Sequence, residues 1–179
     1  MEANRLSAAT AAAVCASLEG HIGYLDAEIE QTTKLIRAHI NEHPELKRQS
    51  ELRDSIPGIG EATAAMLLAE IGNITGYDSA RQVAAFAGLA PRRHESGETV
   101  RGRARLSKVG TPRLRKALYF PALTALRFNP TIKAWGEGLR ARGKSQMVVI
   151  GAAMRKLIHI AYGVLKSGKP FDPELAKSA

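Results

Sequence analysis

Over the first forty residues, apolar or small side chains recur in alternating steps of four and three, the spacing of a heptad seam on one long helix. Charged residues such as Asp26, Glu28 and Lys34 fall outside this seam. The pattern predicts a helix over residues 6–43 that ends at Pro44. Because the helix is long and its seam is narrow, a coiled-coil arm is favoured over a helix packed on its own domain. The seam residues are Ala11, Cys15, Leu18, Ile22, Leu25, Ile29, Thr32 and Ile36.

A second pattern occupies residues 52–72, where a short helix, a glycine-containing turn and an apolar helix over 61–71 follow one another. Gly58 and Gly60 in the turn permit unusual backbone angles and the close approach of a partner. This is the helix-hairpin-helix pattern, in which N–H groups at the start of the second helix bind phosphate. The alternative is a simple turn between two core helices.

The rest of the chain predicts further helices. The last helix, ending at Ser167 or Gly168, is apolar on nearly all sides and is expected to be the central core helix. The tail from Lys169 is expected to be loose. The predicted fold is all-α, with a coiled-coil arm over residues 1–48 and a compact helical domain over 49–179. Helix starts are expected at Asp78 or Ser79, Thr111-Pro112, Asn129-Pro130 and Ser145, with a kink at Pro121.

Charge is distributed unevenly along the chain. Residues 1–90 contain 7 Lys and Arg against 12 Asp and Glu, whereas residues 91–179 contain 19 against 5, for a net charge of +14. Such a basic half is expected to bind an acidic partner, and nucleic acid is the leading candidate. Aromatic residues make up only 5% of the chain. Contacts with phosphates are therefore favoured over base stacking.

Other compartments and partners are disfavoured. A single cysteine, Cys15, excludes an internal disulfide, so the expected compartment is a reducing cytoplasm. The N-terminus shows no signal-peptide pattern. The best candidate for a membrane span, residues 147–165, is interrupted by Arg155, Lys156 and His159, so no membrane partner is expected.

His39, Glu42 and His43 spell H-x-x-E-H, which matches an inverted zinc-protease motif. The motif lies at a polar helix end just before Pro44, and no third ligand with a suitable context follows. A solvated helix end is the favoured interpretation, and no metal site is predicted.

A basic, glycine-rich segment over residues 91–110 predicts a long loop, with a short hairpin near 99–101. Residues 91–116 hold nine Lys and Arg and two Glu. Guanidinium groups bind phosphate oxygens in bidentate fashion and stabilise the charge of a pentavalent transition state. The hydroxyl of Ser96 in this loop has the chemistry to attack phosphorus. From spacing alone a simple binding loop is favoured over a catalytic one, and Ser107 is a second serine of the same kind.

Several blocks, taken in order, carry a family resemblance. They resemble the C-terminal transposase domain of the insertion-sequence "one-ten" family, which are RNA-guided serine recombinases also called bridge recombinases. The resemblance covers almost the whole chain, including the arm. The blocks are SIPGIGEATAAMLLAEIG, FAGLAPRRHESGETVRGRARLSKVG, LRKALYFPAL, AAMRKL and YGVLKSGKPFD.

The resemblance implies that Ser96, within Arg-His-Glu-Ser-Gly, is a nucleophile that becomes joined to DNA through a phosphoserine. It also implies a structured guide RNA as a partner. The arginines implied to lie near DNA or guide RNA are Arg92, Arg93, Arg101, Arg103 and Arg105. The other candidate nucleic-acid contacts are Gly58, Gly60, His94, Lys108 and Arg113.

Full-length members of the family also carry an N-terminal RuvC-like domain with four acidic metal ligands. This chain starts at the arm, and its second half has five acidic residues that are not arranged as a metal quartet. We therefore expect a truncated product or an excised fragment that holds no cofactor and is inactive alone. Magnesium is expected in the RuvC-like domain. The resemblance also implies that the serine of one subunit works with the acidic site of another.

These expectations form one hypothesis: an all-α domain with a basic catalytic loop serves DNA transposition by site-specific recombination, as a homodimer or tetramer assembled through the arm. Two other classes stay open. One is a non-catalytic helix-hairpin-helix module that binds DNA or RNA, such as a regulatory remnant of a transposase. The other is a coiled-coil assembly piece whose charge only solubilises it. Covalent trapping with Ser96→Ala tests the first alternative, and salt-dependent binding tests the second.

Overall fold

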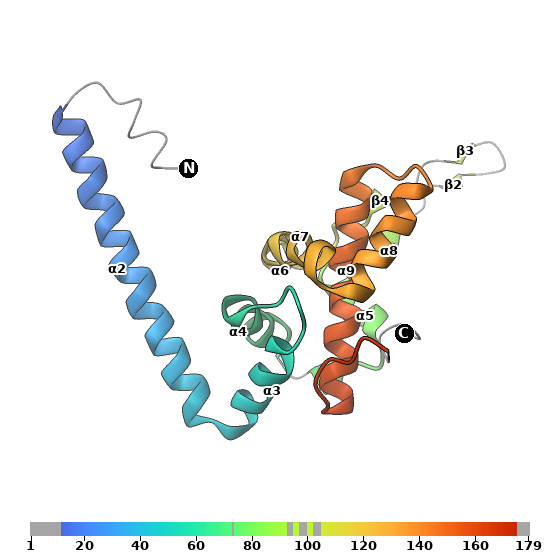
Figure 1. Cartoon of the computed structure of the whole chain (residues 1–179), viewed down its shortest axis with the longest axis horizontal. Coiled ribbons are helices and arrows are strands. Elements are labelled where there is room, and N and C mark those ends of the chain that lie inside the picture. The colour runs from blue at the N-terminus through green and yellow to red at the C-terminus, as the bar shows by residue number, and fades with distance from the viewer. Residues whose placement is uncertain (1–11, 73, 93–94, 97–99, 102–104, 175–179) are drawn as a thin grey trace. The chain divides into compact units, whose positions relative to one another are not determined.

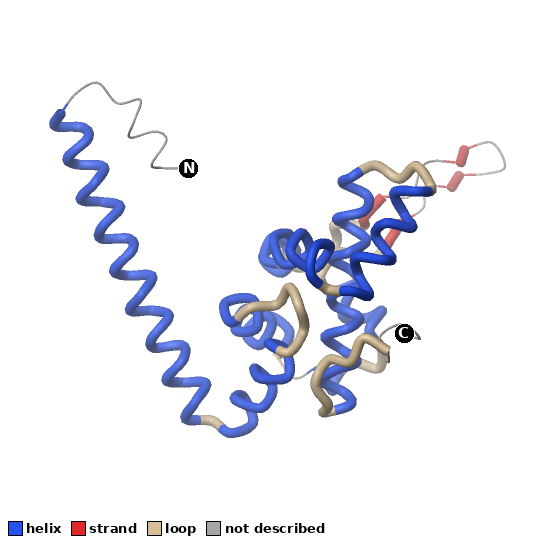
Figure 2. The backbone as a smooth tube through the Cα atoms, viewed as in Figure 1, coloured by secondary structure: helices blue, strands red, loops and turns tan. Residues whose placement is uncertain are grey.

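The computed structural model describes residues 12–72, 74–92, 95–96, 100–101 and 105–174. Within these ranges helices dominate and the strands are two residues long, which confirms the predicted all-α class (Figure 1, Figure 2). The chain divides into two units, residues 1–44 and 45–179. The helices are α2 (Ala12–Glu42), α3 (Pro44–Asp54), α4 (Glu61–Ile71), the 3-10 turn η1 (Ile74–Gly76), α5 (Ala80–Phe86), α6 (Pro112–Ala117), α7 (Tyr119–Phe128), α8 (Pro130–Ala141) and α9 (Gln146–Ser167). The strands are β1 (Pro91–Arg92), β2 (Glu95–Ser96), β3 (Val100–Arg101) and β4 (Arg105–Leu106).

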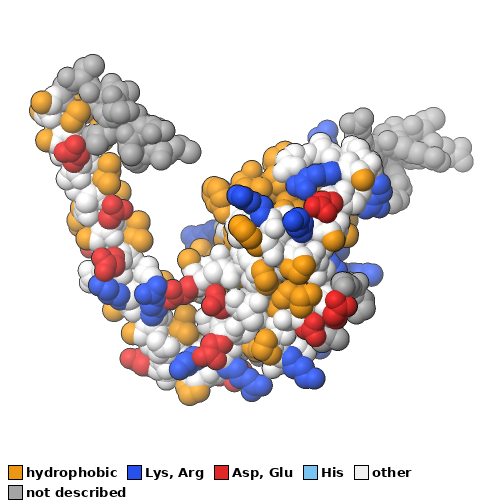
Figure 3. All heavy atoms as spheres, in the orientation of Figure 1, with side chains coloured by type: hydrophobic (Ala, Val, Ile, Leu, Met, Phe, Trp, Pro, Cys, Tyr) orange, Lys and Arg blue, Asp and Glu red, His pale blue; other side chains and the backbone are white. Residues whose placement is uncertain are grey.

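The first unit contains α2, a helix of 31 residues with no buried residue. The predicted seam can be followed on it from Cys15, since Ala11 lies outside the described residues. Leu25, Ile29 and Ile36 of the seam are exposed, and Figure 3 shows hydrophobic side chains along the surface of α2. The seam therefore forms an apolar stripe on the helix surface, and its pairing with another helix remains a prediction.

The core of the second unit is built around α9, as predicted. Eleven of its 22 residues are buried, and it packs against α5, α7 and α8. Ser145 precedes the helix, and Gly168, with a left-handed φ of 64°, follows it. By length and composition, α9 is the one described helix that also fits a membrane span. Since 67% of that apolar stretch is buried inside the protein, a core helix accounts for it.

The sequence predicted one helix from Pro112 to about Phe128 with a kink at Pro121, whereas the structure has two helices in this region. Instead of one bent helix, α6 ends at Ala117 and α7 begins at Tyr119, with Leu118 between them. Proline has no N–H group to donate to the carbonyl four residues before it, and its ring clashes with that carbonyl. For Pro121 that carbonyl belongs to Ala117, which is why the break falls one turn before the proline.

Asn129 is a fully buried polar residue that connects the α3–α4 turn with α8. Its Oδ1 accepts a hydrogen bond from the backbone N–H of Ile132 at 3.2 Å, which is the helix cap that the sequence predicted for α8. Its Nδ2 also donates to the carbonyl of Pro57 at 3.3 Å. The side chain therefore fastens the α3–α4 turn to the start of α8.

The tail after α9 is attached to the domain over its described residues, so the prediction of a loose tail is wrong for this stretch. The backbone N–H of Phe171 donates to Ser55 Oγ at 2.9 Å. Thr131 Oγ1 donates to the carbonyl of Pro173 at 3.4 Å. Two hydrogen bonds to different helical regions hold this stretch against the second unit.

Arg53 is fully buried at the end of α3. Its Nη1 donates to the carbonyl of Gln49 at 3.2 Å, while Nε and Nη2 have no hydrogen-bond partner among the described residues. Burial lowers the pKa of Arg53 to about 10. Because the buried cation has lost its hydration, its charged form opposes folding at every pH below that value.

Candidate nucleic-acid interface

The described residues of the basic segment form two short antiparallel strand pairs, together called the ribbon, where a long loop was predicted. Strand β1 pairs with β4, and β2 pairs with β3 (strands in red in Figure 2). A short hairpin near 99–101 was expected from the sequence; the β2–β3 pair falls at this place, and the β1–β4 pair lies nearer the ends of the segment. A two-stranded ribbon is narrow enough to enter the major groove of DNA.

The outer pair of strands places two of the predicted contacts directly opposite each other. Arg92 and Arg105 are partners in the ladder, and both are exposed. Opposed residues of an antiparallel pair have Cβ atoms about 5 Å apart, and like charges in such positions repel each other. An anion bound by both guanidinium groups would remove this repulsion, so the pair favours a phosphate as its partner.

The inner pair of strands contains the candidate nucleophile. Ser96 lies opposite Val100, and Glu95 lies opposite Arg101. Ser96 and Arg101 therefore belong to the same short strand pair, and their roles as nucleophile and nucleic-acid contact stay predictions. Three other predicted contacts, Arg93, His94 and Arg103, lie outside the described residues.

Backbone hydrogen bonds close the ribbon at its base. The N–H of Ser107 donates to the carbonyl of Ala90 at 2.8 Å, and that of Lys108 donates to the carbonyl of Gly88 at 3.1 Å. Lys108 is exposed and has a φ of 57°, a left-handed conformation that is uncommon for a residue other than glycine. The hydroxyl of Ser107 accepts a hydrogen bond from the N–H of Val109 at 3.3 Å. The second candidate serine thus takes part in the turn at the base of the ribbon.

Arg115 of α6 holds both chain segments at this base, a role that sequence reasoning missed. Its Nη1 donates to the carbonyl of Ala87 at 3.5 Å and to the carbonyl of Lys108 at 3.4 Å. In the sequence Arg115 is one of nine cations between residues 91 and 116. No local pattern separates it from its neighbours, because both of its acceptors are carbonyls brought close by the fold.

The α3–α4 turn has a helix on each side. The bounds of α4 are those expected from the sequence, whereas α3 begins at Pro44, earlier than the short helix predicted in the 52–72 stretch. Gly58 has a φ of 109°, which favours glycine. A Cβ at this position would lie 2.7 Å from the Cβ of Ala125 and 2.9 Å from the carbonyl oxygen of Pro121. The close approach that Gly58 permits is therefore made to α7 of its own domain.

Gly60 is the glycine of this turn that faces open space. It is exposed, and a Cβ added to it would meet no atom within 4 Å. It precedes α4 in an extended conformation with no side-chain cap. A shallow hollow lined by Thr63, Phe120 and Thr124 lies beside it. Of the two predicted glycine contacts, Gly60 has the space for a phosphate at the start of a helix.

Arg113 lies near the same helix. Its side chain is 83% exposed, and its Nη1 is 3.9 Å from Glu70 Oε1 of α4. An exposed ion pair at this distance is weak. The guanidinium group of Arg113 therefore remains accessible for the phosphate contact predicted from the sequence.

A second group of cations, formed by Arg81, Arg155 and Lys156, lies near His159 where α5 packs on α9. Arg155 and His159 are one helical turn apart on α9, with Lys156 beside them, and Arg81 of α5 is close enough to act on both. Burial and then the Arg155, Lys156 and Arg81 charges lower the pKa of His159. In the described part of the chain no carboxylate pairs with these cations.

This α5–α9 cation cluster is also connected to the ribbon. Nη1 of Arg155 donates to the carbonyl of Leu89 at 3.3 Å, two residues before β1 begins. Sequence reasoning missed the cluster because Arg81 and Arg155 are far apart along the chain. Together with the ribbon it extends the surface that attracts anions.

The known proteins that are similar to this chain are transposases and gene-inverting proteins. Residues 50–136, which include the α3–α4 turn and the whole ribbon, match the family described as "Transposase IS116/IS110/IS902 family". The chain is 34% identical over 158 residues to the "Pilin gene-inverting protein" of Moraxella bovis, covering 88% of this chain and 49% of that protein. It is 31% identical over 161 residues to the "Transposase for insertion sequence element IS1328" of Yersinia enterocolitica, covering 87% and 46%. The chain spans about half the length of these relatives.

The helical core, the basic ribbon and the family match together define a transposase domain. The family match and the relatives support an IS116/IS110/IS902-family transposase domain in this chain. This is the family that the sequence blocks resembled.

Proposed function

We propose that this chain serves DNA transposition by site-specific recombination, and that its ribbon holds the backbone of a nucleic acid. The observation that carries the proposal is the exposed, directly opposed pair of Arg92 and Arg105 within a transposase domain. The names of the relatives, a gene-inverting protein and a transposase, describe rearrangements of DNA. A cytoplasmic location and a structured guide RNA as a second partner belong to the same proposal.

Ser96 is the proposed nucleophile. Its Oγ forms a bond to a backbone phosphorus of DNA, the bond from that phosphorus to a sugar oxygen breaks, and one DNA end stays joined to the protein as a phosphoserine ester. The serine proton passes to a base, and the leaving sugar oxygen takes up a proton. One phosphoester bond replaces another, so the reverse reaction can join the end to a new strand. Guanidinium groups along the ribbon stabilise the extra negative charge of the transition state.

We propose that the magnesium used in cleavage is not held by the described residues of this chain. Magnesium prefers oxygen ligands such as carboxylates, whereas the group of three ligating side chains found among the described residues contains two imidazoles. We place magnesium in a RuvC-like acidic domain outside this chain, where it would neutralise charge on the scissile phosphate. This chain would then need that domain for cleavage.

The salt dependence of the affinity for DNA tests the binding step. Affinity for duplex DNA is expected to show little sequence preference and to fall steeply from 50 to 200 mM salt, because phosphate contacts release counterions. Replacing both Arg92 and Arg105 with Gln should reduce the slope of log affinity against log salt by roughly 1.8, or about 0.9 for each lost phosphate contact. Fluorescence anisotropy with a labelled duplex measures both quantities.

The matched control for this measurement is Lys47→Gln, which removes an exposed cation from the acidic half of the chain. It should leave the salt slope close to that of the wild type. An affinity that stays flat across the salt range contradicts nucleic-acid binding. An unchanged slope in the double variant removes the ribbon from the interface.

The arm is proposed to join two or more copies of the chain through the heptad seam. Replacing Leu25 and Ile29 with Asp puts two charges into that seam and should raise the dissociation constant of self-association by more than about 100-fold. The control, Ala27→Asp with Gln31→Asp, adds the same charge outside the seam. Sedimentation equilibrium measures the assembly, and a wild type that stays monomeric at high concentration contradicts the prediction.

A further inference from the structure

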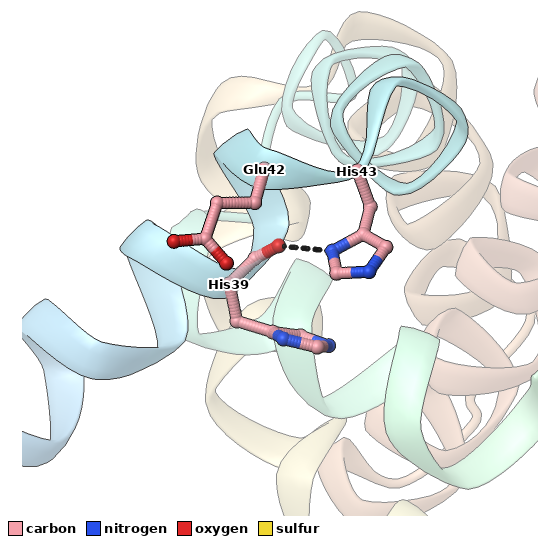
Figure 4. A group of neighbouring side chains, drawn as sticks. All are labelled: His39, Glu42 and His43. Atoms are coloured by element: carbon pink, nitrogen blue, oxygen red, sulfur yellow. Dashed lines mark hydrogen bonds between the residues drawn. The ribbon is translucent and has the colours of Figure 1, made fainter.

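Three potential metal ligands meet at the end of α2, outside the surface assigned to nucleic acid. His39, Glu42 and His43 each offer one ligand atom, and these atoms all lie within 4.8 Å of one another. Figure 4 shows the three side chains leaving the last turn of the helix and the residue after it. All three residues are exposed, so their side chains are free to rotate without repacking a core.

The hydrogen bond made by Nδ1 of His43 leaves the other ring nitrogen available to bind a metal ion. Nδ1 lies 2.8 Å from the carbonyl oxygen of His39 (Figure 4). A carbonyl oxygen can only accept, so Nδ1 carries the hydrogen, and Nε2 of the neutral ring keeps a free lone pair. Histidines that bind metals are commonly oriented by such a bond from the other ring nitrogen to a carbonyl or carboxylate. The two imidazole rings are also close, with centroids 4.5 Å apart.

We propose that His39, Glu42 and His43 bind a divalent transition metal ion, Zn²⁺ in the first instance, with water completing the coordination. Two imidazoles and one carboxylate form a ligand set that suits zinc. Bonds of about 2.0–2.2 Å to a shared ion require ligand atoms within roughly 4 Å of one another. The three side chains are exposed, so their rotation can bring the ligand atoms to this distance. Glu42 serves here as a ligand, which supplies the third ligand that the sequence motif lacked.

A metal ion bound at this position would stabilise the last turn of α2. This helix has no buried residue, so packing within the chain gives it little support. An ion bound by residues of one helical turn stabilises the helical form, because the unfolded chain does not hold the three ligands together. The site therefore couples metal binding to the order of the arm.

The test uses the full chain in a Cys15→Ser background, so that the single thiol does not bind metal, with Zn²⁺ alone as the probe. Competition with a chromophoric chelator at pH 7.5 measures affinity, and circular dichroism measures the zinc-dependent rise in thermal stability of the helix. His39→Ala and His43→Ala should each weaken binding at least tenfold and remove the stabilisation. The matched control is His21→Ala, which removes another exposed histidine of α2 and should change neither quantity.

Binding that is equally strong in wild type, His39→Ala and His43→Ala overturns the proposal. So does the absence of binding by the wild type at millimolar zinc. An equal loss in His21→Ala also overturns it, because the ligands would then lie elsewhere on the helix.

Discussion

Replacement of Ser96 by Ala is expected to abolish the covalent adduct between protein and DNA, with a loss of roughly 10³-fold or more. The substitution removes the only atom proposed to bond to phosphorus and keeps the arginines of the ribbon. DNA binding should therefore stay nearly unchanged. The measurement is a denaturing gel with labelled DNA, run on a protein that joins this chain to a RuvC-like acidic domain. The chain alone should form little or no adduct, since a serine hydroxyl needs a base or a metal to become a good nucleophile.

Two further variants make the result specific to position 96. Ser96→Cys should keep part of the activity, because a thiol is still a nucleophile. Ser107→Ala should keep the full adduct, since Ser107 takes part in the turn at the base of the ribbon. A covalent band that survives in Ser96→Ala and disappears in Ser107→Ala identifies the other serine as the nucleophile. Strand exchange with no band in any variant rules out the serine mechanism.

Gly110→Ala is expected to destabilise the second unit by about 3 kcal/mol or more. Gly110 has a φ of 135°, which other residues rarely adopt. A Cβ there would collide with the carbonyl oxygen of Phe86 and lie 2.7 Å from the backbone nitrogen of Gly88. These neighbours are backbone atoms at the base of the ribbon, so they cannot move aside as a flexible side chain does. Urea unfolding followed by circular dichroism measures the change.

The matched control is Gly138→Ala in α8. Gly138 is exposed, lies inside the helix and has open space around its Cβ position. Alanine is a better helix former than glycine, so the free energy of unfolding of this variant should rise by up to about 1 kcal/mol. Neutral surface substitutions change the free energy of unfolding by roughly 0.5 kcal/mol or less. If the value for Gly110→Ala differs from that of the wild type by no more than this, the close packing at the base of the ribbon is not required for folding.

Helix positions followed largely from local sequence. Pro112 and Pro130 each begin a helix, and Ser145 precedes the last one, because proline and small polar residues suit these positions for local reasons. The apolar character of α9 likewise identified the core helix before any packing was known. The 4–3 spacing predicted a long first helix, and α2 occupies most of that range.

The sequence predicted which residues make up the candidate site, but it did not predict how they are arranged. The positive charge and the serine of residues 91–110 were evident from the sequence. The same local signals of glycine and charge that predicted a loop could not reveal that Arg92 lies opposite Arg105, because this depends on the pairing of β1 with β4. The roles of Arg115 and of the α5–α9 cation cluster were missed for a related reason, since their partners are distant in the sequence.

The sequence by itself determined the helical class, most helix boundaries, the identity of the core helix and the concentration of positive charge in the second half. Each of these depends on residues within a few turns of one another. Only the tertiary structure decided that Gly58 packs on α7, that Asn129 holds the α3–α4 turn, and that the ribbon closes at Gly88 and Lys108. These contacts join segments that are distant in the sequence. The hydrophobic periodicity of each segment does not predict them, because they depend on how the helices pack around α9.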